Sequence, residues 1–295
     1  MEPTKEFSIG PVKVGGAQPQ ILIAGPCVIE SEAHATMIAE RLKEIAARAG
    51  VALIFKASYD KANRSSVNSY RGPGIEEGLR ILKNIRQRTG LPVLTDVHEV
   101  AHVAPVAEVC DVVQIPAFLC RQTDLLVAAG KSGRAVNLKK GQFAAPWEME
   151  NALEKIASTG NEQILLTERG SSFGYNNLVV DMRAFQVMRG FGFPVIFDVT
   201  HSVQLPGAAG QSSGGQPEFI APLARAGTAA GVDGIFLEVH DHPAKALSDG
   251  TNALALEKLP ALLGQITRLA ALVREKLPPQ EKAKPDEKAK QDEKR

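Results

Sequence analysis

The chain has 295 residues, of which 44% are hydrophobic and 23% are charged, and its formal net charge is +1. A hydrophobic content this high can form a large core and excludes a chain that is disordered throughout. A dedicated nucleic-acid surface is usually basic, so the near-neutral charge argues against nucleic acid as a partner. Any site for anions must instead be a local cluster of cations.

Nothing in the sequence indicates secretion or a membrane segment. The cysteines Cys27, Cys110 and Cys120 are too few, and odd in number, for a disulfide framework. The first residues lack the basic region and apolar core of a signal peptide, and no apolar run reaches the roughly 18 to 20 residues of a membrane span. We therefore expect a cytoplasmic protein without membrane contact.

The first predicted element is a β-hairpin over residues 7–14, where apolar residues alternate around Gly10-Pro11. From residue 21 onward, short β-rich apolar runs alternate with longer helical patterns. The first helix has clear end signals, because Ser31 is a suitable N-cap residue and Gly50 follows the last turn. Strands are expected at residues 21–27, 52–58, 92–98, 112–118, 135–141, 164–170, 194–201 and 234–240. Helices are expected at residues 32–49, 75–89, 100–109, 122–129, 147–159, 178–189, 219–230 and 254–277.

Eight strand–helix alternations imply parallel strands that are joined by crossover helices. A closed (β/α)8 barrel, the TIM barrel of the α/β class, is favoured over an open sheet because no glycine-rich phosphate loop follows the first strand. The hairpin would then cover the bottom of the barrel. We expect residues 1–277 to form this single catalytic domain. Residues 278–295 repeat a charged motif without an apolar face and are expected to form a disordered tail.

Polar residues at the C-terminal ends of the predicted strands are the main functional signal. Alternate residues of a barrel strand point into the barrel, and active sites of this fold lie at those ends. In the second strand, Ile54, Lys56 and Ser58 share one parity, and the opposite parity is entirely apolar. Alone, such a lysine is more often a surface residue, but all eight strands show the same arrangement. The inward polar residues are then Cys27, Lys56, Ser58, Asp96, His98, Gln114, Asn137, Lys139, Arg169, His201, Glu238 and His240.

One group of these residues is cationic. Its members are Lys56, Lys139 and Arg169 at strand ends, with Lys61 and Arg64 in the loop after the second strand. So many cations in one cavity would repel one another unless an anion neutralised them. Phosphate and carboxylate are the natural ligands. The alternative is a structural pairing of these cations with carboxylates of the chain, such as Asp60, Asp96 and Glu168.

A second group combines cysteine, histidine and carboxylates. Its members are Cys27, His201, Glu238 and Asp249. These ligand types bind first-row metals, and their mixed softness suits Fe(II), Zn(II), Co(II) or Mn(II) better than Mg(II) or Ca(II). The long spacing leaves rival ligands open, namely His98, His240 and His242. Residues 207–215, rich in glycine and serine, form either a mobile lid over the site or a plain connector.

At these residues, the sequence closely resembles the family of 3-deoxy-D-manno-octulosonate 8-phosphate synthases. The matching motifs run in order from about Ile21 to Asn252 and together are highly specific. They are Ala24-Gly-Pro-Cys-Val-Ile-Glu-Ser31, Phe55-Lys-Ala-Ser-Tyr-Asp-Lys-Ala-Asn-Arg-Ser-Ser66, Leu94-Thr-Asp-Val-His-Glu99, Gln114-Ile-Pro-Ala-Phe-Leu-Cys-Arg-Gln-Thr-Asp124, Asn137-Leu-Lys-Lys-Gly-Gln-Phe143, Thr167-Glu-Arg-Gly170, Phe197-Asp-Val-Thr-His-Ser202 and Leu237-Glu-Val-His240. The Lys-Ala-Asn-Arg-Ser-Ser loop separates this family from the related aldoheptulosonate synthases, which tend to carry Lys-Pro-Arg-Thr there.

The resemblance implies the metal-dependent branch of this family. That branch has cysteine at position 27, where the metal-independent branch has asparagine, and Ser248-Asp249-Gly250 also looks like the metal-dependent form. His201, Glu238 and Asp249 match the remaining metal ligands of that branch. A divalent Fe, Zn, Mn or Co ion is therefore the expected cofactor.

The resemblance also implies the reaction. The family condenses phosphoenolpyruvate with D-arabinose 5-phosphate and water to give 3-deoxy-D-manno-octulosonate 8-phosphate (KDO 8-phosphate) and inorganic phosphate, in lipopolysaccharide biosynthesis. Phosphoenolpyruvate would contact Lys56, Lys61, Gln114, Lys139 and Arg169. The sugar phosphate would contact Asn63, Arg64, Ser65 and, in a homotetramer, Arg121 of a neighbouring subunit.

Roles in the reaction are expected for several of these residues. Ser58 and His201 are expected to contact substrate, and Cys27, Lys61, Asp96 and His201 to serve catalysis. Asp96 would orient a metal ligand or a water molecule. Two alternatives remain for the chain: a related phosphoenolpyruvate–aldose synthase, such as an aldoheptulosonate-phosphate synthase, and a non-catalytic phosphate-binding barrel.

Overall fold

The structure of the protein is a computed structural model that describes residues 3–64, 66–207 and 214–275. Ser65, most of the predicted lid and the predicted tail 278–295 lie outside these ranges. Among the helices described, none is long and apolar enough to cross a membrane.

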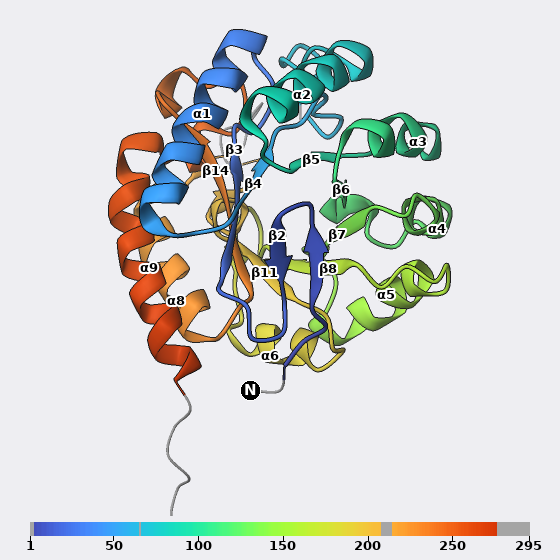
Figure 1. The fold of residues 1–295 in the computed structure, drawn as a ribbon, viewed down its shortest axis with the longest axis vertical. Helices are drawn as coiled ribbons and strands as arrows, with labels where there is room; N and C mark the ends of the chain where they lie inside the picture. Colours follow the sequence, from blue (N-terminus) through green and yellow to red (C-terminus); the bar gives the residue numbers. More distant parts are fainter. Residues whose placement is uncertain (1–2, 65, 208–213, 276–295) are drawn as a thin grey trace, which may run out of the picture.

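The predicted (β/α)8 barrel is confirmed. Each of its eight strands pairs in parallel with the next, and the last strand pairs with both the seventh and the first, which closes the barrel. The strands are β3 (Ile21–Gly25), β4 (Leu53–Lys56), β5 (Val93–Asp96), β6 (Val112–Ile115), β7 (Ala135–Lys139), β8 (Ile164–Glu168), β11 (Val195–Asp198) and β14 (Gly234–His240). Figure 1 shows the helices around these strands, with the N-terminal hairpin in front of the barrel.

Helices connect the strands, mostly at the predicted positions. The Oγ of Ser31 accepts a hydrogen bond from the His34 backbone N–H at 3.2 Å and so caps the first helix, which Gly50 ends in a left-handed conformation. The α-helices are α1 (Glu32–Ala49), α2 (Ile75–Thr89), α3 (Val100–Val109), α4 (Thr123–Lys131), α5 (Met149–Ala157), α6 (Arg183–Arg189), α7 (Val199–Ser202), α8 (Ile220–Ala229) and α9 (Leu259–Arg274). Short 3-10 helices occupy Ala117–Leu119, Pro146–Glu148, Pro217–Phe219, Pro243–Lys245, Gly250–Asn252 and Leu256–Lys258.

Seven of the eight predicted strands end two or three residues too late, and three predicted elements differ because of local pairing or capping. The seventh strand stops at Asp198, whose side chain caps the short helix α7, so His201 lies on a helical turn rather than on the strand. The predicted helix over residues 178–189 begins only at Arg183, because β10 (Leu178–Val179) pairs with β9 (Ser171–Ser172). Similarly, β15 (Leu254–Ala255) pairs with the end of β14, and α9 follows it. In each case, local pairing or capping overrides a pattern that sequence alone assigns to a longer element.

Two apolar cores lie on the two faces of the strands, as the parity of β4 predicts. Leu53 and Phe55 belong to the core between strands and helices, whereas Ile54 belongs to the core inside the barrel. The inner core also contains residues of the hairpin formed by β1 (Phe7–Ile9) and β2 (Val12–Val14). Its members are Ile9, Val12, Val14, Ile21, Ile23, Ile54, Leu94, Val112, Ala135, Leu165, Ile196 and Phe236. The hairpin therefore closes the bottom of the barrel as predicted, and the opposite end is left for the site.

Candidate functional site

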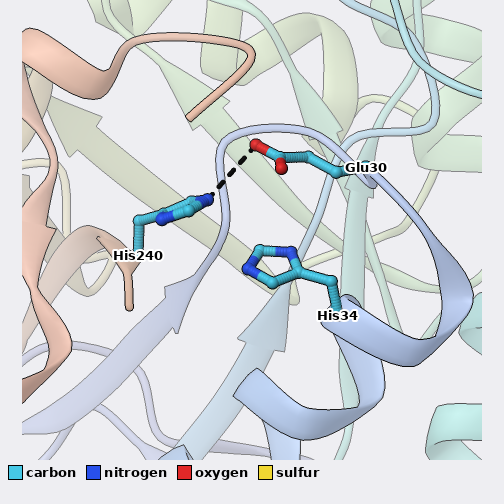
Figure 2. Close-up of side chains that lie close together, drawn as sticks. All are labelled: Glu30, His34 and His240. Atoms are coloured by element: carbon cyan, nitrogen blue, oxygen red, sulfur yellow. Dashed lines mark hydrogen bonds and ion pairs between the residues drawn. The ribbon is translucent and has the colours of Figure 1, made fainter. Parts of the chain in front are cut away.

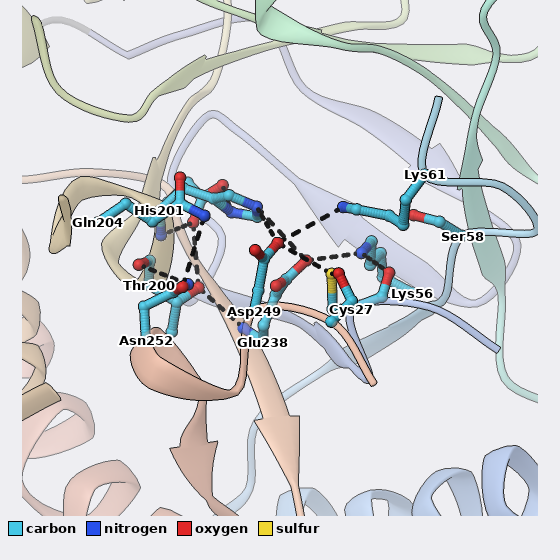
Figure 3. Close-up of polar contacts among 12 residues, drawn as sticks. Cys27, Lys56, Ser58, Lys61, Thr200, His201, Gln204, Glu238, Asp249 and Asn252 are labelled. Carbon is cyan, nitrogen blue, oxygen red and sulfur yellow. Dashed lines mark hydrogen bonds and ion pairs between the residues drawn. The ribbon is translucent and has the colours of Figure 1, made fainter. Parts of the chain in front are cut away.

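A cavity of about 600 Å³ lies at the C-terminal ends of the barrel strands. It brings together most of the residues that the sequence predicts for the site. Its polar wall contains Lys56, Lys61, Asn63, Arg64, Asp96, His98, Gln114, Lys139, Gln142, Arg169, His201, Gln204 and Asp249. Figure 3 shows Lys56 and Lys61 on one side and His201 on the other, with Cys27, Glu238 and Asp249 between them.

A close approach of two strands positions Cys27 and Lys56. A Cβ atom on Gly25 would lie 1.8 Å from the carbonyl oxygen of Lys56, so β3 and β4 can lie this close only with glycine at position 25. Beyond β3, the Lys56 Nζ donates to the carbonyl oxygen of Cys27 at 2.8 Å. The backbone of Cys27 is thus held against β4, and its side chain lies beside Glu238 and Asp249.

Cys27, Glu238 and Asp249 form a cluster of metal-ligand type, with one donor atom from each within 4.8 Å of the others. The Cys27 Sγ lies 3.0 Å from the Asp249 Oδ2. His201 adjoins the cluster, since its Nε2 lies 3.5 Å from the Glu238 Oε1 and 3.9 Å from the Asp249 Oδ2. The second oxygen of Glu238, Oε2, is buried and has no hydrogen-bond partner within residues 3–64, 66–207 and 214–275. A thiol, an imidazole and two carboxylates with an unsatisfied buried oxygen fit a divalent transition metal.

The surroundings of the cluster shift the pKa of the Cys27 thiol and the pKa of the Glu238 carboxyl group in opposite directions. Burial, followed by the negative charges of Asp249 and Glu238, raises the pKa of the Cys27 thiol well above its usual value. Burial would also raise the pKa of Glu238, but the charges of His201 and Lys56 outweigh it and hold this pKa well below the usual range. A thiolate at Cys27 therefore needs an additional positive charge beside it, which a metal ion would provide.

Asp249 has a backbone conformation that supports a functional role. Its φ of 52° lies in the left-handed region, which a residue with a side chain seldom adopts. Such a conformation costs about 1 kcal/mol or more and persists where the surrounding structure requires it. Here it places the carboxylate 3.8 Å from the Lys61 Nζ as well as beside Cys27.

The buried lysines of the site have carboxylate partners, although not those considered from the sequence. The Lys56 Nζ lies 2.8 Å from the Glu238 Oε1, and the Lys139 Nζ lies 2.5 Å from the Asp198 Oδ2. The three carboxylates that the sequence suggested as partners of these lysines contact other residues. Asp60 pairs with Arg71, Asp96 accepts from Ser58, and Glu168 lies beside Lys140.

Arg169 retains an unpaired donor. Its Nη2 donates to the Gln204 Oε1 at 2.8 Å, but its buried Nη1 has no hydrogen-bond partner among the residues that the structure describes. Burial lowers the pKa of Arg169 and also that of Lys139, which is the effect expected for cations taken out of water. The loop that carries Arg169 is fixed by Glu168, whose Oε1 accepts the backbone N–H groups of Arg169 and Gly170. The guanidinium is therefore preorganised for an anion in the cavity.

Asp198 is a residue of the site that sequence reasoning missed. Its Oδ2 lies 2.6 Å from the His201 Nδ1, so the imidazole is oriented with Nε2 toward Glu238. The sequence could have indicated Asp198, because it has the same parity on β11 as Ile196, which lies in the core inside the barrel. Gln142 and Gln204 also line the cavity without having been predicted.

Other predicted residues lie away from the cavity. Arg121 is exposed and does not line it, and Ser58 is buried behind Asp96. Of the rival metal ligands, His98 lies 3.3 Å from the Asp96 Oδ2, and His240 contacts Glu30 instead of Cys27. At the predicted lid, Gly207 lines the cavity. There β12 (Gln204–Leu205) pairs with β13 (Gly214–Gly215), and the residues between 207 and 214 lie outside the described ranges.

Comparison with known proteins shows the family of the chain. The model of the DAHP synthetase I family matches residues 3–275. Proteins named 2-dehydro-3-deoxyphosphooctonate aldolase from Trichlorobacter lovleyi and Pelobacter propionicus are 62% and 63% identical over 271 residues, which is 92% of this chain and 100% of each relative. The protein of that name from Geobacter sulfurreducens is 60% identical over 271 residues, with the same coverage. The chain therefore belongs to the DAHP synthetase I family.

Proposed function

We propose that the protein condenses phosphoenolpyruvate with D-arabinose 5-phosphate and water to give KDO 8-phosphate and inorganic phosphate. The relatives named 2-dehydro-3-deoxyphosphooctonate aldolase, similar over their full length, support this activity. The observation that carries it is the cavity itself, which Lys61, Lys139 and Arg169 line together with Asp249 of the Cys27 cluster. We place the reaction in the cytoplasm, in lipopolysaccharide biosynthesis.

Phosphoenolpyruvate carries negative charges that would neutralise the cations of the cavity. Its carboxylate and phosphate would be neutralised by Lys56, Lys61, Lys139 and Arg169, with Gln114 as a further hydrogen-bond donor. Arg169 is the best supported of these contacts, because it lines the cavity from a fixed loop and its Nη1 has no hydrogen-bond partner among the described residues. Lys56 and Lys139 would contribute mainly charge, since each already has a carboxylate partner.

The sugar phosphate would bind toward the outer part of the cavity. Asn63 and Arg64 line the cavity, and Ser65 follows them in the chain. Arg64 is already held by the Ser248 Oγ, to which it donates at 2.7 Å. His201 completes the proposed substrate contacts, whereas the predicted contact Ser58 is buried and would act through Asp96, to which it donates. We further propose a homotetramer in which Arg121 of a neighbouring subunit reaches the same phosphate.

The reaction is an aldol-like condensation. Carbon 3 of phosphoenolpyruvate attacks the aldehyde carbon of arabinose 5-phosphate, and water adds to carbon 2. Cleavage of the bond between carbon 2 and the phosphate oxygen then releases inorganic phosphate and leaves the ketone. The lysines and Arg169 stabilise the negative charge that develops on the substrates, and Asp96, held by Ser58, orients water or a ligand of the metal site.

Cys27, His201, Glu238 and Asp249 would hold the divalent metal, with Fe, Zn, Mn and Co as the chemically suitable ions. Bound there, the metal would supply orientation and Lewis-acid polarisation of the aldehyde or of water. Removal of metal with a chelator should abolish turnover, and addition of one of these ions should restore it. Full activity of a verified metal-free sample would disprove the metal dependence.

The proposed reaction is tested by phosphate release from purified protein that is supplied with metal. Release is expected only when phosphoenolpyruvate and arabinose 5-phosphate are both present. Erythrose 4-phosphate, as a competing aldose, distinguishes an aldoheptulosonate-phosphate synthase, because that enzyme would turn over the shorter sugar faster. If no aldose leads to phosphate release, the proposal is refuted, and a non-catalytic phosphate-binding barrel is the remaining interpretation.

A further inference from the structure

A second cluster of metal-ligand residues lies beside the first but outside the cavity wall. Glu30 lies between β3 and α1, His34 lies in the first turns of α1, and His240 ends β14. One donor atom from each lies within 4.8 Å of the other two, and Figure 2 shows their side chains facing one another. The side chains of Glu30 and His34 are 17% and 16% exposed, so the cluster can be reached from solvent.

The ring of His34 is oriented as in a metal-binding histidine. Its Nε2 lies 2.9 Å from the Asp241 Oδ1, whereas its Nδ1 is buried and has no hydrogen-bond partner in the described part of the chain. A histidine that binds a metal through one nitrogen usually donates the other N–H to a carboxylate, which fixes the tautomer and the ring plane. His34 has this carboxylate in place and leaves one nitrogen unsatisfied.

Asp241 can orient His240 in the same way. The Asp241 Oδ1 also lies 3.1 Å from the His240 Nδ1, while the His240 Nε2 faces the Glu30 Oε1 at 3.3 Å. Without an ion, the His240 Nδ1 accepts the backbone N–H of His242 at 2.9 Å. With an ion on Nε2, the proton would move to Nδ1, so the bond from the His242 N–H would have to break and Asp241 would accept the Nδ1 proton instead. One carboxylate thus serves both rings, whose centroids are 4.7 Å apart.

The charge of the cluster also favours a cation. Glu30 and Asp241 contribute two carboxylates, and among the described residues their ion pairs are with His34 and His240 only, not with lysine or arginine. With neutral imidazoles, the group carries two negative charges that a divalent ion would balance. Imidazole and carboxylate together suit Zn(II), Co(II), Ni(II) or Cu(II), and three protein ligands leave a position open for water.

We infer that Glu30, His34 and His240 form a second site for a divalent transition metal, with Asp241 as the carboxylate that orients both imidazoles. None of these residues lines the cavity, and none has a role in the proposed reaction. It adjoins the first cluster through Glu30, whose Oε1 also accepts the backbone N–H of Leu247 at 2.8 Å, two residues before Asp249.

The test is to titrate metal-free protein with Co²⁺ and to count the bound ions by equilibrium dialysis and elemental analysis. Wild type should bind two ions per chain, and His34→Gln and Cys27→Ser should each bind one. The double variant should bind none. A thiolate-to-cobalt charge-transfer band reports on Cys27 alone, so His34→Gln should keep this band and Cys27→Ser should lose it.

A matched control is His102→Gln, because His102 is also a helical histidine with a side-chain partner, the hydroxyl of Tyr59 at 3.0 Å. It should bind as many ions as wild type. Glu30→Gln provides a second variant of the site in case His34→Gln does not fold, as judged by circular dichroism. Equal numbers of ions on wild type and on the folded site variant would overturn the second site. If only the Cys27 cluster fails to bind metal, wild type binds one ion, which His34→Gln loses and Cys27→Ser keeps.

Discussion

At the scale of single residues, the cation group and the Cys27 group share their carboxylates. Glu238 lies 2.8 Å from the Lys56 Nζ and 3.5 Å from the His201 Nε2, and Asp198 lies beside both Lys139 and His201. The chain's own carboxylates therefore balance the two lysines, while Arg169 keeps a free donor. Because the groups share partners, a substitution in one group alters the electrostatics of the other.

Replacement of Cys27 by asparagine tests the assignment of this residue as a metal ligand. An amide is a weak ligand for transition metals, so we expect the affinity for Zn²⁺ or Co²⁺ at this cluster to fall at least about 100-fold. Turnover should fall with the metal content. Competition with a chromophoric chelator measures the affinity, and phosphate release measures turnover.

Cys110→Ala is the matched control for this substitution. Cys110 is also buried, but it lies in the core between strands and helices. Its removal should therefore cost about 1 kcal/mol of stability and leave the metal affinity unchanged. A Cys27→Asn protein with the metal affinity of wild type would show that this thiol is not a ligand.

At the scale of elements, alternation along the strands was sufficient to place most of the site. The inward parity of β4 and β7 predicted Lys56 and Lys139 on the cavity wall, because a strand in a barrel has only two faces. Asp198 and the helical turn of His201 were not predictable in this way. The run 194–201 reads as one strand, and its end depends on a hydrogen bond from the His201 backbone N–H to the Asp198 side chain. Such capping is visible only once the strand end is known.

The contact between β3 and β4 predicts a severe effect of Gly25→Ala. The added Cβ would lie 1.8 Å from the Lys56 carbonyl oxygen, so the two strands must separate. We expect a loss of at least about 3 kcal/mol in the free energy of unfolding. Lys56 and Cys27 should move together, which would weaken binding of both phosphoenolpyruvate and metal. Urea denaturation and ligand titrations measure these effects.

Gly264→Ala provides the control at a site with open space. A Cβ on Gly264, an exposed residue of α9, meets nothing within 4 Å. Alanine should therefore stabilise the protein by up to about 1 kcal/mol through its higher helix propensity. Similar stabilities of the two variants would contradict the proposed role of the close strand contact.

At the scale of the whole molecule, stability and activity are assigned to opposite ends of the barrel. Val14 in the hairpin is fully buried in the inner core, whereas the cavity lies at the other end. Val14→Ala should lower the free energy of unfolding by about 2 kcal/mol and leave kcat and KM unchanged. Its neighbour Lys13 is exposed, so Lys13→Ala should change stability by less than about 0.5 kcal/mol. Loss of activity in folded Val14→Ala would show that the two ends are coupled.

If the protein is the proposed homotetramer, the site of each chain needs Arg121 of a neighbouring subunit. Arg121 is exposed and lies outside the cavity of its own chain, so Arg121→Ala should raise the KM for arabinose 5-phosphate without unfolding the protein. Lys61→Met should inactivate the cavity of its own chain. If Arg121 acts across a subunit contact, mixed oligomers of the two variants combine an intact cavity with an intact Arg121.

Co-expression of the two variants in equal amounts should restore activity at roughly a quarter of the sites for random pairing across a two-fold contact. Mixing of the separately purified, non-exchanging oligomers is the control and should restore none. If co-expression gives only the sum of the two variants' activities, Arg121 does not act across the contact. The recovered sites have a normal affinity for the sugar phosphate only when Arg121 reaches them. The KM for arabinose 5-phosphate of the mixed oligomers therefore distinguishes complementation from stabilisation of one variant by the other.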